Sequence, residues 1–339
     1  MKKKTFLIFT LPSFIMMVFF IAIPLLTVFF QSFQFDQEVL ETKEQEQCDP
    51  FGCKTETVTV PVLDKNGNTI KQKVWVGFQN YHNLLKFDEV KKAFSPHGVG
   101  WKDIKNIEFY KALRFTLTFT FITLPFILIF GLILALCVNA LTQRLRGSII
   151  FIILLPFIIT PIIGSLSIKW LFIGDGIITA FLEWLNETNY SFFADGNSIE
   201  ILMIFYRIWH TTPFSFIIFY AALQTVDKEK IEAAIVDGAN RFERLRYIII
   251  PHIMPLITFV TLIHLMDAYR VFDEIVGFNA ASYRISLQWL TFDYLSLDLG
   301  GNRFIGRASA TSVLTMIGII VILSPVLRQT WKDQKARRI

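Results

Sequence analysis

Six apolar segments, each long enough to cross a lipid bilayer, constrain this chain more than any other feature. Crossing the hydrocarbon core takes roughly 20 mostly apolar residues, and only helices or closed barrels satisfy their backbone polar groups there. The segments qualify as helices and cover residues 6–30, 115–141, 149–168, 201–223, 253–275 and 308–327. We therefore expect an all-α integral membrane protein with six transmembrane helices.

The composition also favours a membrane protein. Hydrophobic residues make up 53% of the 339 residues and Phe occurs 35 times, more than a soluble core of this length needs. The net charge of +5 would suit a nucleic-acid partner, but the basic residues lie at the ends of apolar segments rather than on one face. The first apolar run is too long for a signal peptide and no small-residue cleavage site follows it, so we expect a retained anchor.

Lys and Arg residues in the short loops and tails predict the orientation, because such residues accumulate on the cytoplasmic side of membrane proteins. Six crossings place on one side of the membrane Lys2, Lys3, Lys4, Arg144, Arg146, Lys228, Lys230, Arg241, Arg244, Arg246, Lys332, Lys335, Arg337 and Arg338. Both termini are therefore predicted to be cytoplasmic.

The topology divides the chain into regions. They are a tail and first span (1–32), a small extracytoplasmic insertion (33–111), a five-helix core with a cytoplasmic loop at 225–251 (112–328), and a basic cytoplasmic tail (329–339). In the insertion, residues 54–62 and 70–76 are rich in Thr and Val and flank Asn66-Gly67. This pattern predicts a β-hairpin with an Asn-Gly turn.

Motifs for catalysis and nucleotide binding are missing from the sequence. It contains no Gly-x-x-x-x-Gly-Lys loop, Gly-x-Ser-x-Gly elbow, His-Glu-x-x-His pair or Gly-x-Gly-x-x-Gly turn. Its three cysteines lack a spacing suited to zinc. Cys48 and Cys53 would form a disulfide only if the insertion faces an oxidising compartment. We expect neither an enzyme nor a metal site, and any ATP would be hydrolysed by another polypeptide.

A charged segment between the fourth and fifth apolar runs is too polar to cross the membrane. Asp227 is a suitable N-cap for a short helix that its Glu and Ala residues favour. Gly238 interrupts this helix, a second amphipathic helix follows, and Pro251 marks the start of the next span. On composition alone, the segment is a solvated linker.

The same segment resembles the EAA loop of binding-protein-dependent ABC transporter permeases. Both have Glu-Ala-Ala, three further residues, Gly and a distal Ile-x-x-Pro. In that family the loop forms a coupling helix that docks into a groove on the ATPase subunit. The residues to which the resemblance assigns coupling are Glu232, Ala233, Ala234 and Gly238, supported by Asp237, Arg241 and Pro251.

The resemblance extends to the carbohydrate branch of the family, with its first permease subunits of maltose-type and glycerol-phosphate-type importers. The matching segments are 76–81, 209–214, 221–224, 272–274 and 306–313. The insertion is longer than in the simplest members, and Asn279-Ala280-Ala281 replaces a Gly-Gly-Pro often found there. These two departures leave the choice of substrate open.

The resemblance implies a function and a set of partners. This chain would translocate a carbohydrate or related polar solute across the cytoplasmic (inner) membrane of a prokaryote. A second homologous permease, two ATPase subunits that bind ATP and Mg, and a soluble or lipid-anchored solute-binding protein would act with it. The resemblance implies no cofactor on this chain and no nucleic-acid partner.

Ionisable side chains interrupt the fourth and fifth spans, where a charge is costly and usually faces a cavity or a partner. His264, Asp267 and Glu274 have the spacing of one helical face. The face either lines a polar route for a hydroxyl-rich solute, or Arg207 and Asp267 simply neutralise one another. The residues predicted for the route are Arg207, Trp209, Thr212, His264, Asp267, Tyr269 and Asp273.

Two other functions remain open from the sequence. An ion-coupled secondary carrier would use an intramembrane carboxylate such as Asp267 to bind a proton or sodium, and its uptake would persist without ATP. It gives the EAA loop no role. A membrane scaffold or signalling protein would bind a partner through the insertion and show no solute flux.

Overall fold

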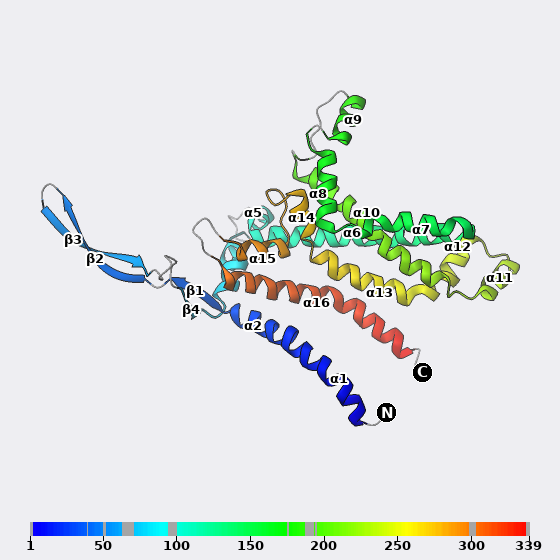
Figure 1. Ribbon diagram of the computed structural model, residues 1–339, viewed down its shortest axis with the longest axis horizontal. Coiled ribbons are helices and arrows are strands. Elements are labelled where there is room, and N and C mark those ends of the chain that lie inside the picture. Colours follow the sequence, from blue (N-terminus) through cyan, green and yellow to red (C-terminus); the bar gives the residue numbers. More distant parts are fainter. Residues whose placement is uncertain are drawn as a thin grey trace. The chain divides into compact units, whose positions relative to one another are not determined.

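The computed structural model describes residues 3–38, 40–49, 52–62, 71–93, 100–174, 176–186, 193, 195–297 and 303–336. The chain splits into two compact units, which are described separately below. Unit 1 comprises Met1–Ile107 and Leu290–Thr315, and unit 2 comprises Glu108–Trp289 and Met316–Ile339. Figure 1 labels most of their helices and strands.

Unit 1 carries the strands and the first apolar helix. Its elements are α1 (Lys3–Met17), the π-helical turn η1 (Val18–Ala22), α2 (Ile23–Gln31), β1 (Gln34–Glu38), β2 (Leu40–Asp49), β3 (Gly52–Pro61), β4 (Lys71–Trp75), α3 (Gln79–Leu85), α4 (Phe87–Ala93) and α5 (Trp101–Asn106). Two further helices, α15 (Leu287–Leu295) and α16 (Ile305–Ala336), contribute residues to both units.

The regular elements in the described part of unit 2 are all helices. Its elements are α6 (Glu108–Asn139), α7 (Gln143–Ile158), α8 (Pro161–Phe172), α9 (Ile177–Asn186), α10 (Gly196–Leu223), α11 (Lys228–Val236), α12 (Arg241–Arg244), the π-helical turn η2 (Leu245–Ile249), α13 (Ile250–Tyr269) and α14 (Asp273–Phe278).

The described residues contain six helical stretches that are long and apolar enough to cross a membrane. They are Ile8–Gln31, Glu108–Asn139, Pro161–Phe181, Gly196–Leu223, Arg241–Tyr269 and Ile305–Lys332. The prediction of a mostly helical protein with six membrane helices is therefore confirmed. The boundaries of the third and fifth spans, however, were predicted wrongly.

The third apolar run is not one helix. Helix α7 ends at Ile158, and Ile159 and Thr160 are extended before α8 begins at Pro161. The residue before a proline is disfavoured in the helical region, whereas proline itself suits the first position of a helix. The predicted span 149–168 is thus divided between two helices.

The fifth span begins earlier and ends earlier than predicted. It runs without interruption from α12 through η2 into α13, so Pro251 lies inside it rather than marking its start. It ends at Tyr269, and α14 follows as a separate short helix. The hydroxyl of Ser286 donates to the freed carbonyl of Val271 at 2.5 Å, which satisfies a backbone group at the break.

The region 33–111 contains a β-hairpin, as predicted, but the strands predicted for it from the Asn-Gly sequence are wrong. Strand β3 pairs antiparallel with β2, and β4 pairs antiparallel with β1, so residues 54–62 and 70–76 do not pair with each other. The β2–β3 hairpin closes over a shorter connection, and its register places Cys48 opposite Cys53. Asn66 and Gly67 lie outside the described residues. A bridge between the cysteines stays a prediction.

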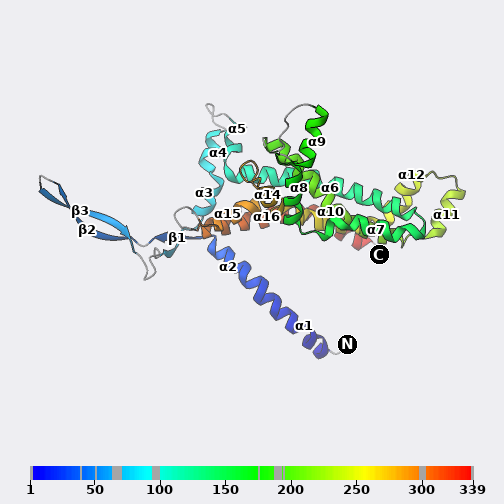
Figure 2. The same cartoon turned by 45° about the horizontal axis from the view of Figure 1, so that its top comes forward.

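The core of unit 2 lies where α6 packs along α10 (Figure 2). Phe119, Met203 and Ile275 are among the buried residues of one cluster, and Phe216 and Val260 belong to a second. Gly131 of α6 permits the close approach of α10, because a Cβ there would come within 2.6 Å of the Cβ of Ser215 and 3.2 Å of the nitrogen of Phe216.

We expect Gly131→Ala to destabilise the protein by about 1–3 kcal/mol, because α10 must move to accept the added methyl group. The measurement is the unfolding temperature of the purified chain in detergent, followed by tryptophan fluorescence. The matched control is Gly147→Ala in α7, where a Cβ meets nothing within 4 Å. Equal unfolding temperatures for the two variants would contradict the packing argument.

Candidate functional site

Arg207 of α10 joins two carboxylates of the predicted route. Its Nη1 donates to Oε1 of Glu274 at 2.7 Å, and its Nη2 donates to Oδ2 of Asp267. The side chains of Arg207 and Glu274 are only 7% and 1% exposed, whereas that of Asp267 is 58% exposed. A buried guanidinium is tolerated when it is paired in this way. Two carboxylates thus share one guanidinium, and Asp267 lies at the accessible end of the cluster.

The break after the fifth span sets the geometry of this cluster. The sequence pattern placed His264, Asp267 and Glu274 along one continuous helical face, which is wrong, because the helix stops at Tyr269. Glu274 instead approaches Arg207 from α14, and Asp267 approaches it from α13. The ion pairs therefore hold three helices together around one side chain.

Helix α14 is held in turn by α8. Gly277 packs against Ser165, where a Cβ would also come within 2.9 Å of the carbonyl oxygen of Ile162. The hydroxyl of Ser165 lies 3.4 Å from the carbonyl oxygen of Asp273 and 2.9 Å from that of Ile162. Burial raises the pKa of the Asp273 carboxyl, and the nearby Glu274 raises it further. Sequence reasoning did not single out Ser165 or Gly277.

The histidines of the two spans are engaged within unit 2. His264 is 2% exposed, and its Nε2 lies 2.7 Å from the hydroxyl of Ser215. His210 places its Nε2 2.9 Å from the carbonyl oxygen of Ile159, at the break between α7 and α8. The hydroxyl of Tyr206 donates to the carbonyl of Pro161 at 2.8 Å. His264 thus lies in the packed interior rather than on an accessible route.

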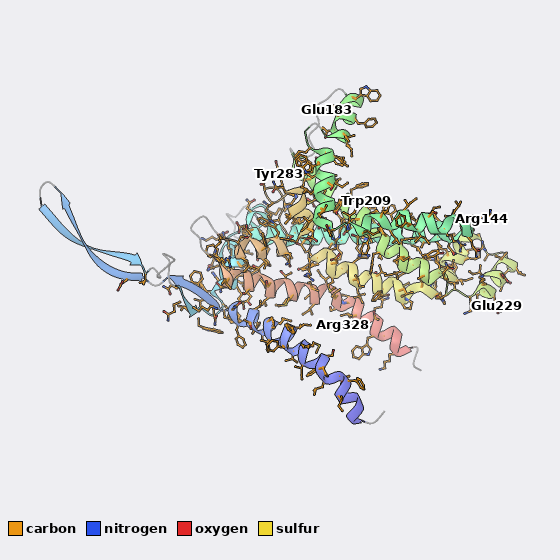
Figure 3. All side chains as sticks on the ribbon, viewed as in Figure 1. Arg144, Glu183, Trp209, Glu229, Tyr283 and Arg328 are labelled. Atoms are coloured by element: carbon orange, nitrogen blue, oxygen red, sulfur yellow. The ribbon has the colours of Figure 1, made fainter. Side chains whose placement is uncertain are left out.

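The other predicted route residues lie elsewhere in unit 2. Trp209, labelled in Figure 3, and Thr212 line an apolar cavity of about 650 Å³ between α6, α7 and α10, together with side chains such as Phe126 and Ile152. Tyr269 is 2% exposed, and its hydroxyl occupies the space that a Cβ on Gly318 would need. Of the seven predicted residues, Arg207 and Asp267 contact each other directly, and Asp273 lies beside Glu274.

The charged loop forms the expected two helices joined at Gly238. The side chain of Asp227 caps α11 by accepting from the nitrogen of Glu229 at 3.1 Å. At the other end Gly238 has φ +83°, its nitrogen donates to Ile235, and the nitrogen of Ala239 donates to Ala234. This is a Schellman C-cap, which favours glycine at that position because of its left-handed backbone.

The helix after the turn has its own N-terminal cap. The nitrogen of Glu243 donates to the side chain of Asn240 at 2.9 Å, and the nitrogen of Asn240 donates to the carboxylate of Glu243 at 2.7 Å. The reciprocal pair is a capping box. Two local motifs therefore fix the angle between α11 and the long helix that starts at Arg241.

A cavity of about 590 Å³ separates α11 from that long helix. Four of the predicted coupling residues line it, namely Ala233, Ala234, Asp237 and Pro251, and so do Tyr247 and His252. Glu232, Gly238 and Arg241 are exposed. The loop also exposes apolar side chains that the prediction did not include: Val236 at 88%, Tyr247 at 71%, Phe242 at 68% and Ile235 at 52%. Their apolar character within a charged segment was the signal available in the sequence.

Comparison with known proteins assigns the chain to a family. Residues 108–337 match the family described as binding-protein-dependent transport system inner membrane component, and the chain belongs to it. It is therefore a permease component of an ABC importer, a multi-pass and non-catalytic membrane subunit. Within the described part of the chain, no group of three or more His, Cys, Asp or Glu side chains is placed to hold a metal ion.

Two curated relatives show which members of the family this chain is similar to. It is 27% identical over 264 residues to the trehalose/maltose transport system permease protein MalF of Thermococcus litoralis, covering 76% of this chain and 80% of that protein. It is 29% identical over 236 residues to the sn-glycerol-3-phosphate transport system permease protein UgpA of Escherichia coli, covering 68% and 75%.

Solved structures agree on the fold. The chain is similar to a chain of a bacterial ABC transporter involved in the import of the acidic polysaccharide alginate, with a TM-score of 0.57, 24% identity and coverage of 75% and 89%. A structure of the bacterial alginate transporter in complex with an alginate pentasaccharide-bound periplasmic protein gives a TM-score of 0.59 at 22% identity. These likenesses show an ABC importer permease fold.

We expect Glu274→Gln to cost about 3–5 kcal/mol of stability, because it leaves the buried Arg207 with only one carboxylate partner. Asp267→Asn should cost clearly less, since water screens the exposed partner. The measurement is thermal unfolding of the purified chain in detergent. Adding Arg207→Met to Glu274→Gln should restore part of the loss, because the unpaired guanidinium is then removed. Equal losses for the two carboxylate variants would contradict this account.

Proposed function

We propose that this chain imports a carbohydrate or a related polar solute across the cytoplasmic membrane of a prokaryote. The observation that carries the proposal is the accessible carboxylate of Asp267, which the buried Arg207 holds in place within a chain of the permease family. A fixed carboxylate accepts hydrogen bonds from hydroxyl groups, which carbohydrates supply in number. The names of the two relatives, one a trehalose/maltose and one a glycerol-phosphate permease, support this class of substrate.

The proposed partners are a second homologous permease, two ATPase subunits that bind ATP and Mg, and a solute-binding protein that is soluble or lipid-anchored. The α11–α12 segment would dock on an ATPase subunit through Glu232, Ala233, Ala234, Asp237, Gly238, Arg241 and Pro251, as the family resemblance implies. We add Val236 and Phe242 as apolar anchors, because exposed apolar side chains at a rigid turn are typical of the centre of an interface.

The proposed orientation places this segment and both termini in the cytoplasm. Arg144, at the start of α7, and Glu229, on α11, lie at the same end of unit 2, while Tyr283 lies toward the other end (Figure 3). That arrangement agrees with the loop charges, since it gathers the basic residues of the two loops on one side. We also propose that the chain is divided into four regions, whose boundaries lie at residues 33, 112 and 329.

We expect Val236→Asp to reduce recovery of the ATPase subunit with the tagged chain, because a carboxylate would replace the most exposed apolar side chain of the loop. The second permease should still co-purify. The matched control is Lys228→Asp, which introduces the same residue at the exposed first position of α11, outside the cavity lining. Recovery of the ATPase at the wild-type level with Val236→Asp would contradict the docking proposal.

We expect Asp267→Asn to raise the KM of uptake roughly ten- to a hundredfold, the equivalent of about one hydrogen bond to a charged acceptor. The measurement is ATP-dependent uptake of candidate sugars into proteoliposomes that contain the assembled importer. The control is Glu183→Gln, a carboxylate on α9 outside the ion cluster. An unchanged KM would make the cluster purely structural, and uptake that needs an ion gradient but no ATP would overturn the importer assignment itself.

A further inference from the structure

Asn80, the second residue of α3, is buried at the place where the chain leaves its first span. Its side chain is 1% exposed, and its amide nitrogen donates to the carbonyl oxygens of Ser32 at 2.9 Å and of Gln34 at 2.8 Å. Both amide hydrogens are thereby used on backbone groups. Ser32 caps the end of α2, where helix carbonyls lack partners within the helix, so Asn80 supplies one of those partners.

Further bonds tie the same short segment to the returning chain. The hydroxyl of Tyr81 donates to the hydroxyl of Ser32 at 2.7 Å, and the nitrogen of Val76 donates to the carbonyl of Phe33 at 2.9 Å. Phe33 also stacks on Trp75 with ring centroids 5.4 Å apart. Residues 32–33, before β1, and residues 75–81, at and after the end of β4, are therefore held side by side.

The first residues of α16 are seated against the same region. A Cβ on Gly306, the second residue of α16, would collide with the carbonyl oxygen of Gln34 and come within 2.8 Å of the amide nitrogen of Asn80. Gly306 is buried there. The amide of Asn80 thus lies between the end of the first span and the beginning of the last span, and all of these residues belong to unit 1.

We infer that Asn80 is a positioning residue for transport: its amide fixes α3 to the end of the first span through hydrogen bonds to Ser32 and Gln34, and the beginning of the last span packs on this seat at Gly306, so that the three elements move as one body. The inference rests on the proposed importer function. Two directed hydrogen bonds define one position of α3 on the end of the first span, and the absence of a side chain at Gly306 lets the last span pack closely on them. A transporter that alternates between two states by rigid-body movement needs elements whose relative positions stay fixed.

The test compares Asn80→Asp with wild type in the assembled importer, reconstituted in proteoliposomes. The aspartate has nearly the same shape but cannot donate to the two carbonyls when ionised, and it places a negative charge against them. The matched control is Asn83→Asp on the exposed side of the same helix. One readout is the number of solute molecules imported per ATP hydrolysed. The second is the distance distribution between spin labels at Phe30 and Arg303, both exposed, in a chain whose native cysteines are replaced by serine.

We expect Asn80→Asp to lower the import-to-hydrolysis ratio roughly threefold or more and to broaden the label distances, with Asn83→Asp resembling wild type, because only the former removes buried hydrogen bonds. Gly306→Ala, which keeps the amide but presses on it, should produce the same two changes and serves if Asn80→Asp assembles poorly. Unchanged ratio and distances in these variants would overturn the inference. A wild-type complex without ATP-dependent uptake would instead overturn the proposed function, while the label distances would still report on these contacts.

Discussion

The structure of unit 2 depends on the burial of one guanidinium. Arg207 pairs with Asp267 and Glu274, and this links α10 to α13 and to α14. In a low-dielectric environment neither the cation nor the buried carboxylate is stable alone, so each element must stay where its charge is matched. The requirement also explains why the fifth span stops before Asp273. The short helix α14 has to turn back for Glu274 to reach Arg207.

Interrupted helices need partners for their freed backbone groups, and this protein supplies them from neighbouring side chains. His210 and Tyr206 of α10 bond the carbonyls of Ile159 and Pro161 at the α7–α8 break. Ser286 bonds the carbonyl of Val271 after the fifth span. Both breaks therefore lie next to helix α10, which also carries Arg207. Polar side chains of α10 thus satisfy freed backbone groups at the α7–α8 break as well as the carboxylates around Arg207.

Two features that depend on a continuous or local sequence pattern were predicted correctly. The six spans follow from apolar length, and the turn at Gly238 follows from a glycine where the C-cap needs a left-handed backbone. The Thr160-Pro161 pair also carried the signal for the α7–α8 break, because a residue before proline resists helix formation.

The pairing of the strands was harder to predict from the sequence. An Asn-Gly pair indicates only a local preference for a turn, whereas the actual partners, β2 with β3 and β1 with β4, depend on the whole segment. Spacing alone does not tell that Trp209 lines an apolar cavity while Arg207 pairs with Asp267 of α13.

The two candidate sites are connected by a single helix. The fifth span is continuous from Arg241, just after the Gly238 turn, to Tyr269, two residues beyond Asp267. At 1.5 Å per residue such a helix is roughly 40 Å long and transmits a displacement along its axis with little loss. The span contains a π-helical turn at Leu245–Ile249, close to the cavity beside α11. If an ATPase subunit docks on the capped α11–α12 segment as we propose, a movement of that subunit would tilt this helix. Asp267 would then move relative to its solute, while the ion pairs would carry α10 and α14 along.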